Sequence, residues 1–141
     1  MKLKQISVFI ENKTGRLAHV ARLLGDAGVN LIALSLADSS DFGILRLIVN
    51  DPEKARTTLR DNQVTCSITD VLAVEVPDRP GGMAELMELM DAQAVNIEYM
   101  YAFAEKNTGR AALIMRFNDT DRALTLLQKA GVNIFSAIAI A

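Results

Sequence analysis

The sequence predicts an α+β protein made of two tandem copies of one β-α-β-β-α-β unit. Three observations support this prediction. The chain repeats itself along its length, each copy alternates strand-like and helix-like patterns in the same order, and a glycine turn opens the first helix of both copies. With 141 residues, the chain is long enough for two units of about 70 residues each.

The internal repeat becomes visible when the second half is placed over the first. An offset of 66 residues aligns the early part of each copy, and an offset of 68 aligns the later part. The slip between the two offsets lies where a hairpin loop can absorb it. The aligned pairs are Gly15 with Gly81, Val29-Asn30-Leu31 with Val95-Asn96-Ile97, and Asn50-Asp51 with Asn118-Asp119.

The first copy contains four predicted strands and two predicted helices. Alternating apolar residues predict strands at about 4–11, 30–37, 43–49 and 64–69. Apolar residues at helical spacing predict a helix that starts near Leu17 and that Gly28 ends. Pro52 suits the first turn of a second helix, in which Ala55 and Leu59 share one face.

The second copy repeats this order. Its predicted strands cover 71–77, 96–105, 110–117 and 132–141, and its predicted helices cover 81–94 and 120–131. The order is that of a ferredoxin-like unit, so we expect two domains at 1–70 and 71–141. A single unit this small has a thin core, so we expect the two antiparallel sheets to join side by side and the chains to form a homodimer.

The last predicted strand favours this association, because both of its faces are apolar or small. Exposed strands of this kind promote aggregation, so we expect a covering surface. One face carries Ile134, Ile138 and Ile140, and the other carries Phe135, Ala137 and Ala139.

Composition excludes several classes of function. The net charge of −2 and the pI of about 5.4 argue against nucleic-acid binding, which favours a basic face. Apolar runs fall short of the roughly 20 residues that a membrane span needs, and the N-terminus is interpreted as a strand rather than a signal peptide. Cys66 is the only cysteine, which suits a reducing compartment, so we expect a cytoplasmic protein that makes no contact with membranes.

The sequence contains no recognisable group of catalytic or metal-binding residues. His19 is the only histidine, and it is interpreted as part of a solvated helix face. One histidine and one cysteine are too few for a zinc site, so no metal or cofactor is expected. Tyr99, Tyr101 and Phe103 share one strand face, but the acidic chain makes core or interface packing a better interpretation than an RNA-binding platform.

The glycine turn, Asp78 to Met83 in the second copy, is the strongest candidate for a binding site. The P-loop and dinucleotide-binding patterns are both absent. A glycine before a helix lets a ligand approach the main chain, and the first helical N–H groups favour a carboxylate. The alternative is that the turn needs glycine for its backbone conformation alone.

Asn30 and Asn96 begin the second strand of each copy, which we expect to lie beside the glycine turn. An asparagine side chain offers both an acceptor and donors. Turn N–H groups for a carboxylate and an asparagine oxygen for an ammonium would together recognise an amino acid. A capping or turn role is the alternative for both asparagines.

The pattern resembles the signature of the ACT domain family: D-x-P-G, a helix of about 14 residues, then G-V-N-[LI]. The second copy has Asp78-Arg79-Pro80-Gly81 followed by Ala94-Val95-Asn96-Ile97, so Ala94 replaces the usual glycine. The first copy has Asn12-Lys13-Thr14-Gly15 followed by Gly28-Val29-Asn30-Leu31, without the aspartate and the proline. The resemblance covers almost the whole chain and implies regulatory modules that bind amino acids at interfaces between ACT units.

These observations and the resemblance together predict a non-enzymatic sensor that binds an amino acid and regulates amino-acid metabolism through a partner enzyme or regulator. The alternative is an interaction module that serves a partner enzyme and binds no ligand of its own. The expected ligand-binding residues are the backbone donors Gly15, Arg16, Leu17, Gly81, Gly82 and Met83, the side chains of Asn30 and Asn96, and the flanking Asn12 and Asp78.

Overall fold

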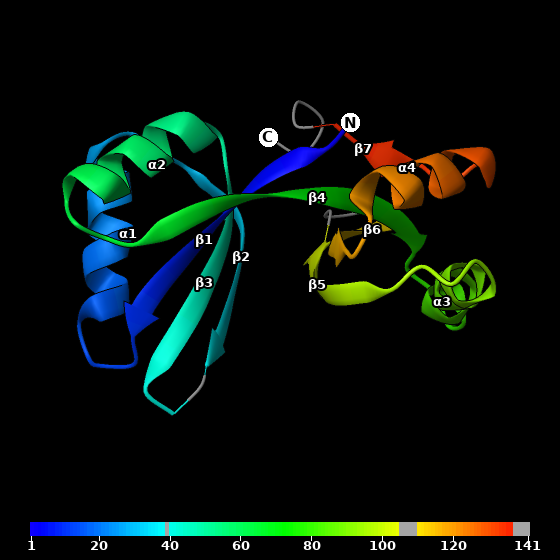
Figure 1. The fold of residues 1–141 in the computed structure, drawn as a ribbon, viewed down its shortest axis with the longest axis horizontal. Coiled ribbons are helices and arrows are strands. Elements are labelled where there is room, and N and C mark those ends of the chain that lie inside the picture. The colour runs from blue at the N-terminus through cyan, green and yellow to red at the C-terminus, as the bar shows by residue number, and fades with distance from the viewer. Residues whose placement is uncertain (39, 105–109, 137–141) are drawn as a thin grey trace. The chain divides into compact units, whose positions relative to one another are not determined.

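The computed structural model describes residues 1–38, 40–104 and 110–136, and the chain divides into two compact units (Figure 1). The first unit spans Lys4–Thr69. The second unit contains Met1–Leu3 together with residues 70–136.

The first unit begins with a strand, a helix and a hairpin. Its elements are β1 (Leu3–Glu11), α1 (Arg16–Asp26), β2 (Leu31–Asp38), β3 (Phe42–Val49), α2 (Pro52–Asp61) and the start of β4 (Cys66–Pro77). Gly28 follows α1 with a φ of 77°, the left-handed conformation that ends a helix. Asp51 caps α2, because its side chain accepts a hydrogen bond from the Lys54 N–H at 3.1 Å.

The second unit repeats this construction. Its elements are the rest of β4, α3 (Gly82–Ala92), β5 (Ile97–Ala104), β6 (Arg110–Phe117), α4 (Thr120–Lys129) and β7 (Ile134–Phe135). Asp119 caps α4 by accepting from the Arg122 N–H at 3.1 Å, as Asp51 does for α2.

The strand pairing confirms the predicted ferredoxin-like fold. The pairing order is β2-β3-β1-β4-β6-β5, and β7 pairs with β4. The first unit therefore has the order β2-β3-β1-β4, and the second has the same order in β5-β6-β4-β7. The strands predicted at 64–69 and 71–77 form the single strand β4. No glycine or proline lies between them, and Asp70, the one residue at the junction, stays in the strand.

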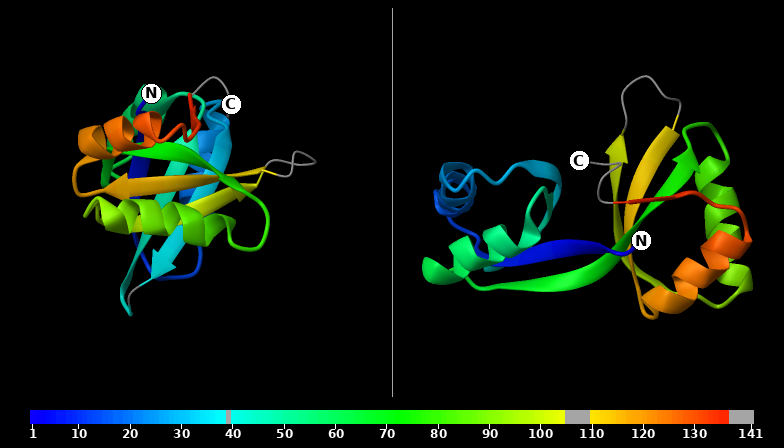
Figure 2. Two further views of the ribbon diagram at one scale, coloured as in Figure 1. Left: turned by 90° about the vertical axis from the view of Figure 1, so that its right-hand side faces the viewer. Right: turned by 90° about the horizontal axis from the view of Figure 1, so that it is seen from above.

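In each unit, two helices cover one face of the sheet (Figures 1 and 2). The apolar side chains of the helices and strands meet in a separate core for each unit, and Leu59 and Leu127 are completely buried at equivalent positions. Both cores follow the predicted periodicity, since Ala55 and Leu59 share the inner face of α2.

Part of the predicted C-terminal strand lies outside the described residues, namely Ala137, Ile138, Ala139 and Ile140. Of the same prediction, Ile134 and Phe135 form β7 and are buried. Within the described ranges, no helix combines the length and the apolar composition that a membrane crossing requires.

Candidate functional site

The two glycine turns have the same backbone conformation. Gly15 has a φ of 90° and Gly81 a φ of 86°, and each is the N-cap residue of the helix that follows. A Cβ atom added at either position would meet no atom of the described residues within 4 Å, its chain neighbours aside. Glycine is therefore required here by the left-handed backbone rather than by crowding.

The turns use some of the amides that the sequence suggested as ligand donors. The Arg16 N–H donates to the Lys13 carbonyl oxygen at 3.3 Å, and the Gly82 N–H donates to the Arg79 carbonyl oxygen at 3.1 Å. Within the part of the chain that the structure describes, no side chain caps α1 or α3. The first amide beyond this turn bond belongs to Leu17 in α1 and to Met83 in α3.

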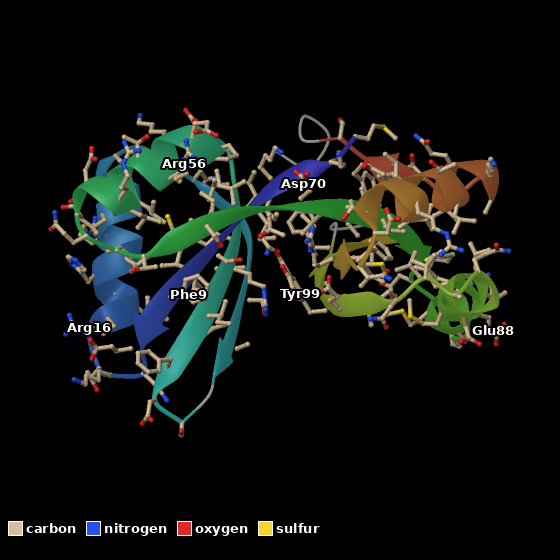
Figure 3. All side chains as sticks on the ribbon, viewed as in Figure 1. Phe9, Arg16, Arg56, Asp70, Glu88 and Tyr99 are labelled. Carbon is tan, nitrogen blue, oxygen red and sulfur yellow. The ribbon has the colours of Figure 1, made fainter. Side chains whose placement is uncertain are left out.

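A cavity of about 400 Å³ lies beside the first glycine turn. Its lining comes from the end of β1, the first turns of α1, the start of β3 and the turn between α2 and β4. Phe9 and Glu11 contribute from β1, and Arg16 and His19 from α1. Figure 3 shows Phe9 on β1 and Arg16 at the start of α1.

The second unit has a cavity of about 370 Å³ in the same place. It is lined by Glu75 and Pro77 of β4, by Gly82 and Glu85 of α3, and by residues 131–133 after α4. The repeat aligns Phe9 with Glu75, Glu11 with Pro77, Arg16 with Gly82 and His19 with Glu85.

Backbone hydrogen bonds confirm that the two cavities are equivalent. The Phe9 N–H donates to the Thr65 carbonyl at 2.9 Å, and the Glu75 N–H donates to the Asn133 carbonyl at the same distance. The first main-chain bond of each helix also matches, from His19 to Gly15 and from Glu85 to Gly81, both at 3.0 Å. The chain thus builds one cavity twice.

The charges around the two cavities differ. In the first unit, Glu11 pairs with Lys13 at 2.9 Å, which leaves Arg16 and His19 as the other ionisable lining residues. In the second unit, Glu75 and Glu85 line the cavity, and none of the described residues in its lining is basic. Arg79, at the position of Lys13, instead reaches both carboxylate oxygens of Glu85, at 3.1 and 3.0 Å.

The electrostatics of Glu11 follow from these neighbours. The hydrogen bond from Lys13 lowers the pKa of the exposed Glu11 carboxyl below its ordinary value. The charge of Lys13 and, less strongly, the charge of Arg16 lower the pKa of Glu11 further. The Arg16 guanidinium therefore acts on the same rim of the cavity as Glu11.

The start of the second strand does not lie beside the glycine turn of its own unit. Glu11, at the end of β1, pairs with Phe42, whereas Leu31, at the start of β2, pairs with Val49. These pairs mark opposite ends of β3, and the 11 residues of α1 separate them by about 16 Å. The expectation was wrong because α1 carries the chain back to the opposite end of the strands before β2 begins, so Asn30 lies far from Gly15.

Asn30 and Asn96 instead share a structural arrangement that the sequence did not reveal. The Asn30 N–H donates to the side-chain oxygen of Asn50 at 2.9 Å, and the Asn50 N–H returns a bond to the Asn30 carbonyl at 3.2 Å. Asn96 and Asn118 make the same two bonds at 3.3 and 3.2 Å. We call each pair an asparagine clamp, and the exposed Asn30 and Asn96 side chains are not needed for it.

The remaining expected residues lie at the surface. Asn12 and Asp78 are exposed within the two turns, and the Asn12 N–H donates to the Asp41 carbonyl at 2.9 Å. Leu17 is 43% exposed and Met83 is 38% exposed, at equivalent positions on their helices. Leu17 also lines a separate apolar cavity of about 220 Å³ against β2 and β3.

Sequence reasoning missed several lining residues of the repeated cavities. His19 lies on an exposed helix face as expected, yet it also lines the first cavity. Residues 62–65 and 131–133 were read only as loops and strand starts. The signal was present in the repeat, since the 68-residue offset aligns these two segments. Among the described residues, no group of three potential metal ligands gathers.

Comparison with known proteins gives a consistent result. The family model described as "ACT domain pair" matches residues 1–137. No curated protein matches the chain. A solved protein from Bacteroides thetaiotaomicron is similar to it at 41% identity and a TM-score of 0.93, covering 99% of this chain and 96% of that one.

Structural similarity extends to more distant proteins of the same fold. The regulatory subunit of aspartate kinase from Thermus flavus has a TM-score of 0.62 at 18% identity, covering 91% of this chain and 92% of that one. The ligand-free form of that subunit from Thermus thermophilus has a TM-score of 0.62 at 16% identity, covering 90% and 91%. These similarities concern the fold alone.

Proposed function

The chain belongs to the ACT domain family, as a pair of ACT domains, and from this premise we propose that it binds a free amino acid and regulates amino-acid metabolism. ACT domains are regulatory domains that bind small-molecule ligands. Residues 1–70 and 71–141 would then be the two domains of a cytoplasmic homodimer. A chain of this kind acts on a partner enzyme or regulator rather than on a substrate.

The observation that carries the proposal is the cavity beside the glycine turn, which occurs twice. Cavities of about 300–1,000 Å³ are typical of small-molecule sites, and both cavities fall near the lower end of that range. Each cavity lies where an uncapped helix begins. Free N–H groups at such a helix end favour a carboxylate, the group that every free amino acid carries.

The separation between each turn and its asparagine suggests how the ligand acts. Gly15 and Asn30 lie at opposite ends of α1, so they serve one ligand only when they come from different ACT domains. We therefore place the amino acid at an interface, with a turn from one domain and an asparagine from another. A ligand that bridges two domains favours one arrangement over others, and regulatory coupling of about 1–3 kcal/mol is typical.

In this proposal, the residues have distinct roles. The amides of Leu17 and Met83 receive the carboxylate, and the left-handed Gly15 and Gly81 leave that approach open. Arg16 and Gly82 line the cavities but donate their own amides within the turns. Asn12 and Asp78 orient the turns, and Asn30 and Asn96 offer side-chain oxygens to the ammonium.

A second candidate function is that of an interaction module for a partner enzyme. The exposed leucines of the first unit favour it, since Leu34 is 57% exposed and Leu36 is 49% exposed on β2. β2 ends the strand order of the sheet, and apolar residues on such a strand suit a protein partner. This function requires no small ligand.

A thermal-shift screen against the twenty amino acids at millimolar concentration tests the proposal. A ligand at 100 times its dissociation constant stabilises the folded chain by about 2.7 kcal/mol. We expect a clear shift for a small group of related amino acids. Stability that is unchanged by all twenty would reject amino-acid binding and leave the interaction module.

The variant Asn96→Ala tests the asparagine. It should weaken binding of the ligand found in the screen without unfolding the chain, because the clamp uses only the main chain of Asn96. Gln128→Ala, which removes an exposed amide from α4, is the matched control. Equal affinity in both folded variants would remove Asn96 from the site.

A further inference from the structure

We propose that the first unit has a second binding site, which takes a phosphate group, either free or attached to a small organic molecule. The site is a cavity of about 380 Å³ between the C-terminal half of α2 and the start of β4. It is distinct from the proposed amino-acid site, because its arginines and its cysteine line neither of the repeated cavities. Its lining residues are Arg56, Arg60, Gln63, Val64, Thr65 and Cys66.

The ionised side chains that line this cavity are cations. Arg56 and Arg60 lie four residues apart on α2 and so share one side of the helix. Figure 3 shows Arg56 on this helix. None of the described residues in the lining is acidic. Two guanidinium groups one helical turn apart can donate to different oxygens of one anion, and their planar shape suits phosphate.

The charges of the two arginines converge on the thiol of Cys66. Burial raises the pKa of this half-buried thiol, and the charges of Arg56 and Arg60 both act in the opposite direction. Because both guanidinium groups act on one sulfur atom, both lie close to the part of the cavity that Cys66 lines. The raised pKa keeps the thiol neutral near neutral pH, so the thiol does not replace an anionic ligand.

Each arginine has one acidic neighbour, which lies outside the cavity lining. Arg56 pairs with Glu53 at 2.9 Å, and Arg60 pairs with Asp61 at 3.7 Å. The side chains of Glu53 and Asp61 are 70% and 64% exposed, so both are surface pairs, which contribute little. A guanidinium also has five N–H donors, more than one carboxylate can accept. Both arginines therefore keep donors for a ligand.

The second unit shows that the fold does not require these side chains. At the equivalent positions α4 and β7 have no charged residue, although the two units are built in the same way. Leu124 packs against the core of its own unit instead. The basic lining is therefore a property of the first unit and is not needed to pack the helix on the sheet. The aligned pairs are Arg56 with Leu124, Arg60 with Gln128 and Cys66 with Ile134.

The rest of the lining suits a ligand larger than a single small ion. Gln63 has a left-handed φ of 58° where the second unit has Gly131, so a polar side chain stands at a position that favours glycine. A phosphate group offers several acceptor oxygens, enough for both arginines and a neighbouring polar group. The volume of about 380 Å³ is in the range of small-molecule sites and leaves room for a small organic body.

Calorimetric titration of the full chain tests the site with inorganic phosphate and glycerol 3-phosphate as probes. Glycerol, and sodium chloride at equal ionic strength, are the negative controls. We expect a phosphate-bearing probe to bind at one site per chain and neither control to bind. Tighter binding of glycerol 3-phosphate would identify a phosphorylated metabolite as the ligand, and tighter binding of inorganic phosphate would identify the free ion.

Three variants locate the bound anion. Arg56→Gln and Arg60→Gln should each weaken binding about 10- to 100-fold, the usual effect of losing a hydrogen bond to a charged group. Arg22→Gln is the matched control, because Arg22 also pairs with an acidic residue of its own helix, Asp26 at 3.4 Å, and does not line the cavity. It removes the same charge and should leave the affinity unchanged.

Alkylation of Cys66 gives a second measurement. Cys66 is the only cysteine of the chain, so its reaction with iodoacetamide, an uncharged reagent, reports on this cavity alone. The tighter-binding phosphate probe should slow the reaction in the unaltered chain and in Arg22→Gln. At the same concentration it should protect Arg60→Gln far less.

The proposed site is rejected if neither probe binds, or if sodium chloride gives the same binding signal. It is also rejected if Arg22→Gln weakens binding as much as the other two variants do. Unchanged binding in Arg56→Gln and Arg60→Gln would place the anion elsewhere on the chain. None of these outcomes affects amino-acid binding, and a negative amino-acid screen leaves the phosphate site standing.

Discussion

The two units of this chain match at the level of individual backbone hydrogen bonds but differ in the side chains around their cavities. Helices α1 and α3 both begin at a glycine with a left-handed backbone, and the turns before them close with the same main-chain hydrogen bonds. Yet the aligned pairs Arg16 and Gly82, and His19 and Glu85, differ in charge or size. The fold thus depends on the backbone of the turn, whereas the polarity of each cavity lining depends on the helical residues that follow it.

The residues with a left-handed backbone after each helix also show that the two units keep the same fold with different residue types. After their first helices, the units have Gly28 with a φ of 77° and Ala94 with a φ of 54°. After their second helices, they have Gln63 with a φ of 58° and Gly131 with a φ of 75°. Each unit therefore keeps one non-glycine residue in a conformation that favours glycine, because the surrounding structure fixes the backbone there.

The largest expected difference between the units concerns the first helical residue. Gly82→Ala should lower the free energy of unfolding by about 3 kcal/mol, since the added Cβ overlaps the Pro77 carbonyl and overpacking typically costs about 1–3 kcal/mol. Arg16→Ala, at the equivalent exposed position, should change it by less than about 0.5 kcal/mol. Urea denaturation of both variants measures the difference.

Gly15→Ala is the informative control for this pair. Its Cβ would meet open space, so only the left-handed backbone opposes it, at about 1–2 kcal/mol. A loss for Gly82→Ala no larger than that for Gly15→Ala would show that the segment between β4 and α3 relaxes easily. Overlap with the Pro77 carbonyl would then not be what requires glycine at position 82.

A smaller loss of stability should occur in both units when the asparagine clamp is removed, because each unit has one. Asn50→Ala and Asn118→Ala each remove one hydrogen bond to a backbone N–H, with an expected loss of about 0.5–1.5 kcal/mol. The bond is 2.9 Å in the first unit and 3.3 Å in the second, so the first variant should lose slightly more. Thermal unfolding of the two variants makes the comparison, and a large loss in only one would mean that the clamps are not equivalent.

The sequence predicted the fold well because periodicity and turn residues act locally. Strands such as β1 and helices such as α2 lie within a residue or two of their predicted bounds. The two expected strands that merge into β4 were misjudged only at their junction, where the end of one repeat was taken for the end of an element.

The candidate site was less predictable because it depends on which residues distant in sequence the fold brings together. Asn30 was expected beside Gly15, but tracing α1 across the sheet puts the two at opposite ends of the helix. The cavity itself is formed by segments far apart in sequence, such as Phe9 on β1 and Val64 after α2. The repeat aligned these residues with the second unit, but only the structure brings them together.

The smallest expected effect is a change in the pKa of one carboxyl group, that of Glu11. Because Lys13 is the main cause of the lowered pKa of Glu11, Lys13→Gln should raise that pKa towards its ordinary value of 4.5, and Arg16→Gln should raise it less. A lowered carboxyl pKa stabilises the fold above the unfolded-state pKa, and this stabilisation is lost as the pH falls through the folded-state pKa. The pH dependence of stability around and below pH 4.5 should therefore weaken most in Lys13→Gln.

NMR titration of the Glu11 side-chain carboxyl carbon measures these shifts, with Arg79→Gln as the control. The second unit has Pro77 in place of Glu11, and Arg79 pairs with Glu85 instead, so Arg79→Gln should leave the Glu11 pKa unchanged. If Arg16→Gln leaves the pKa of Glu11 unchanged as well, the charge of Arg16 does not reach this rim of the cavity. The lowered pKa of Glu11 would then be due to Lys13 alone.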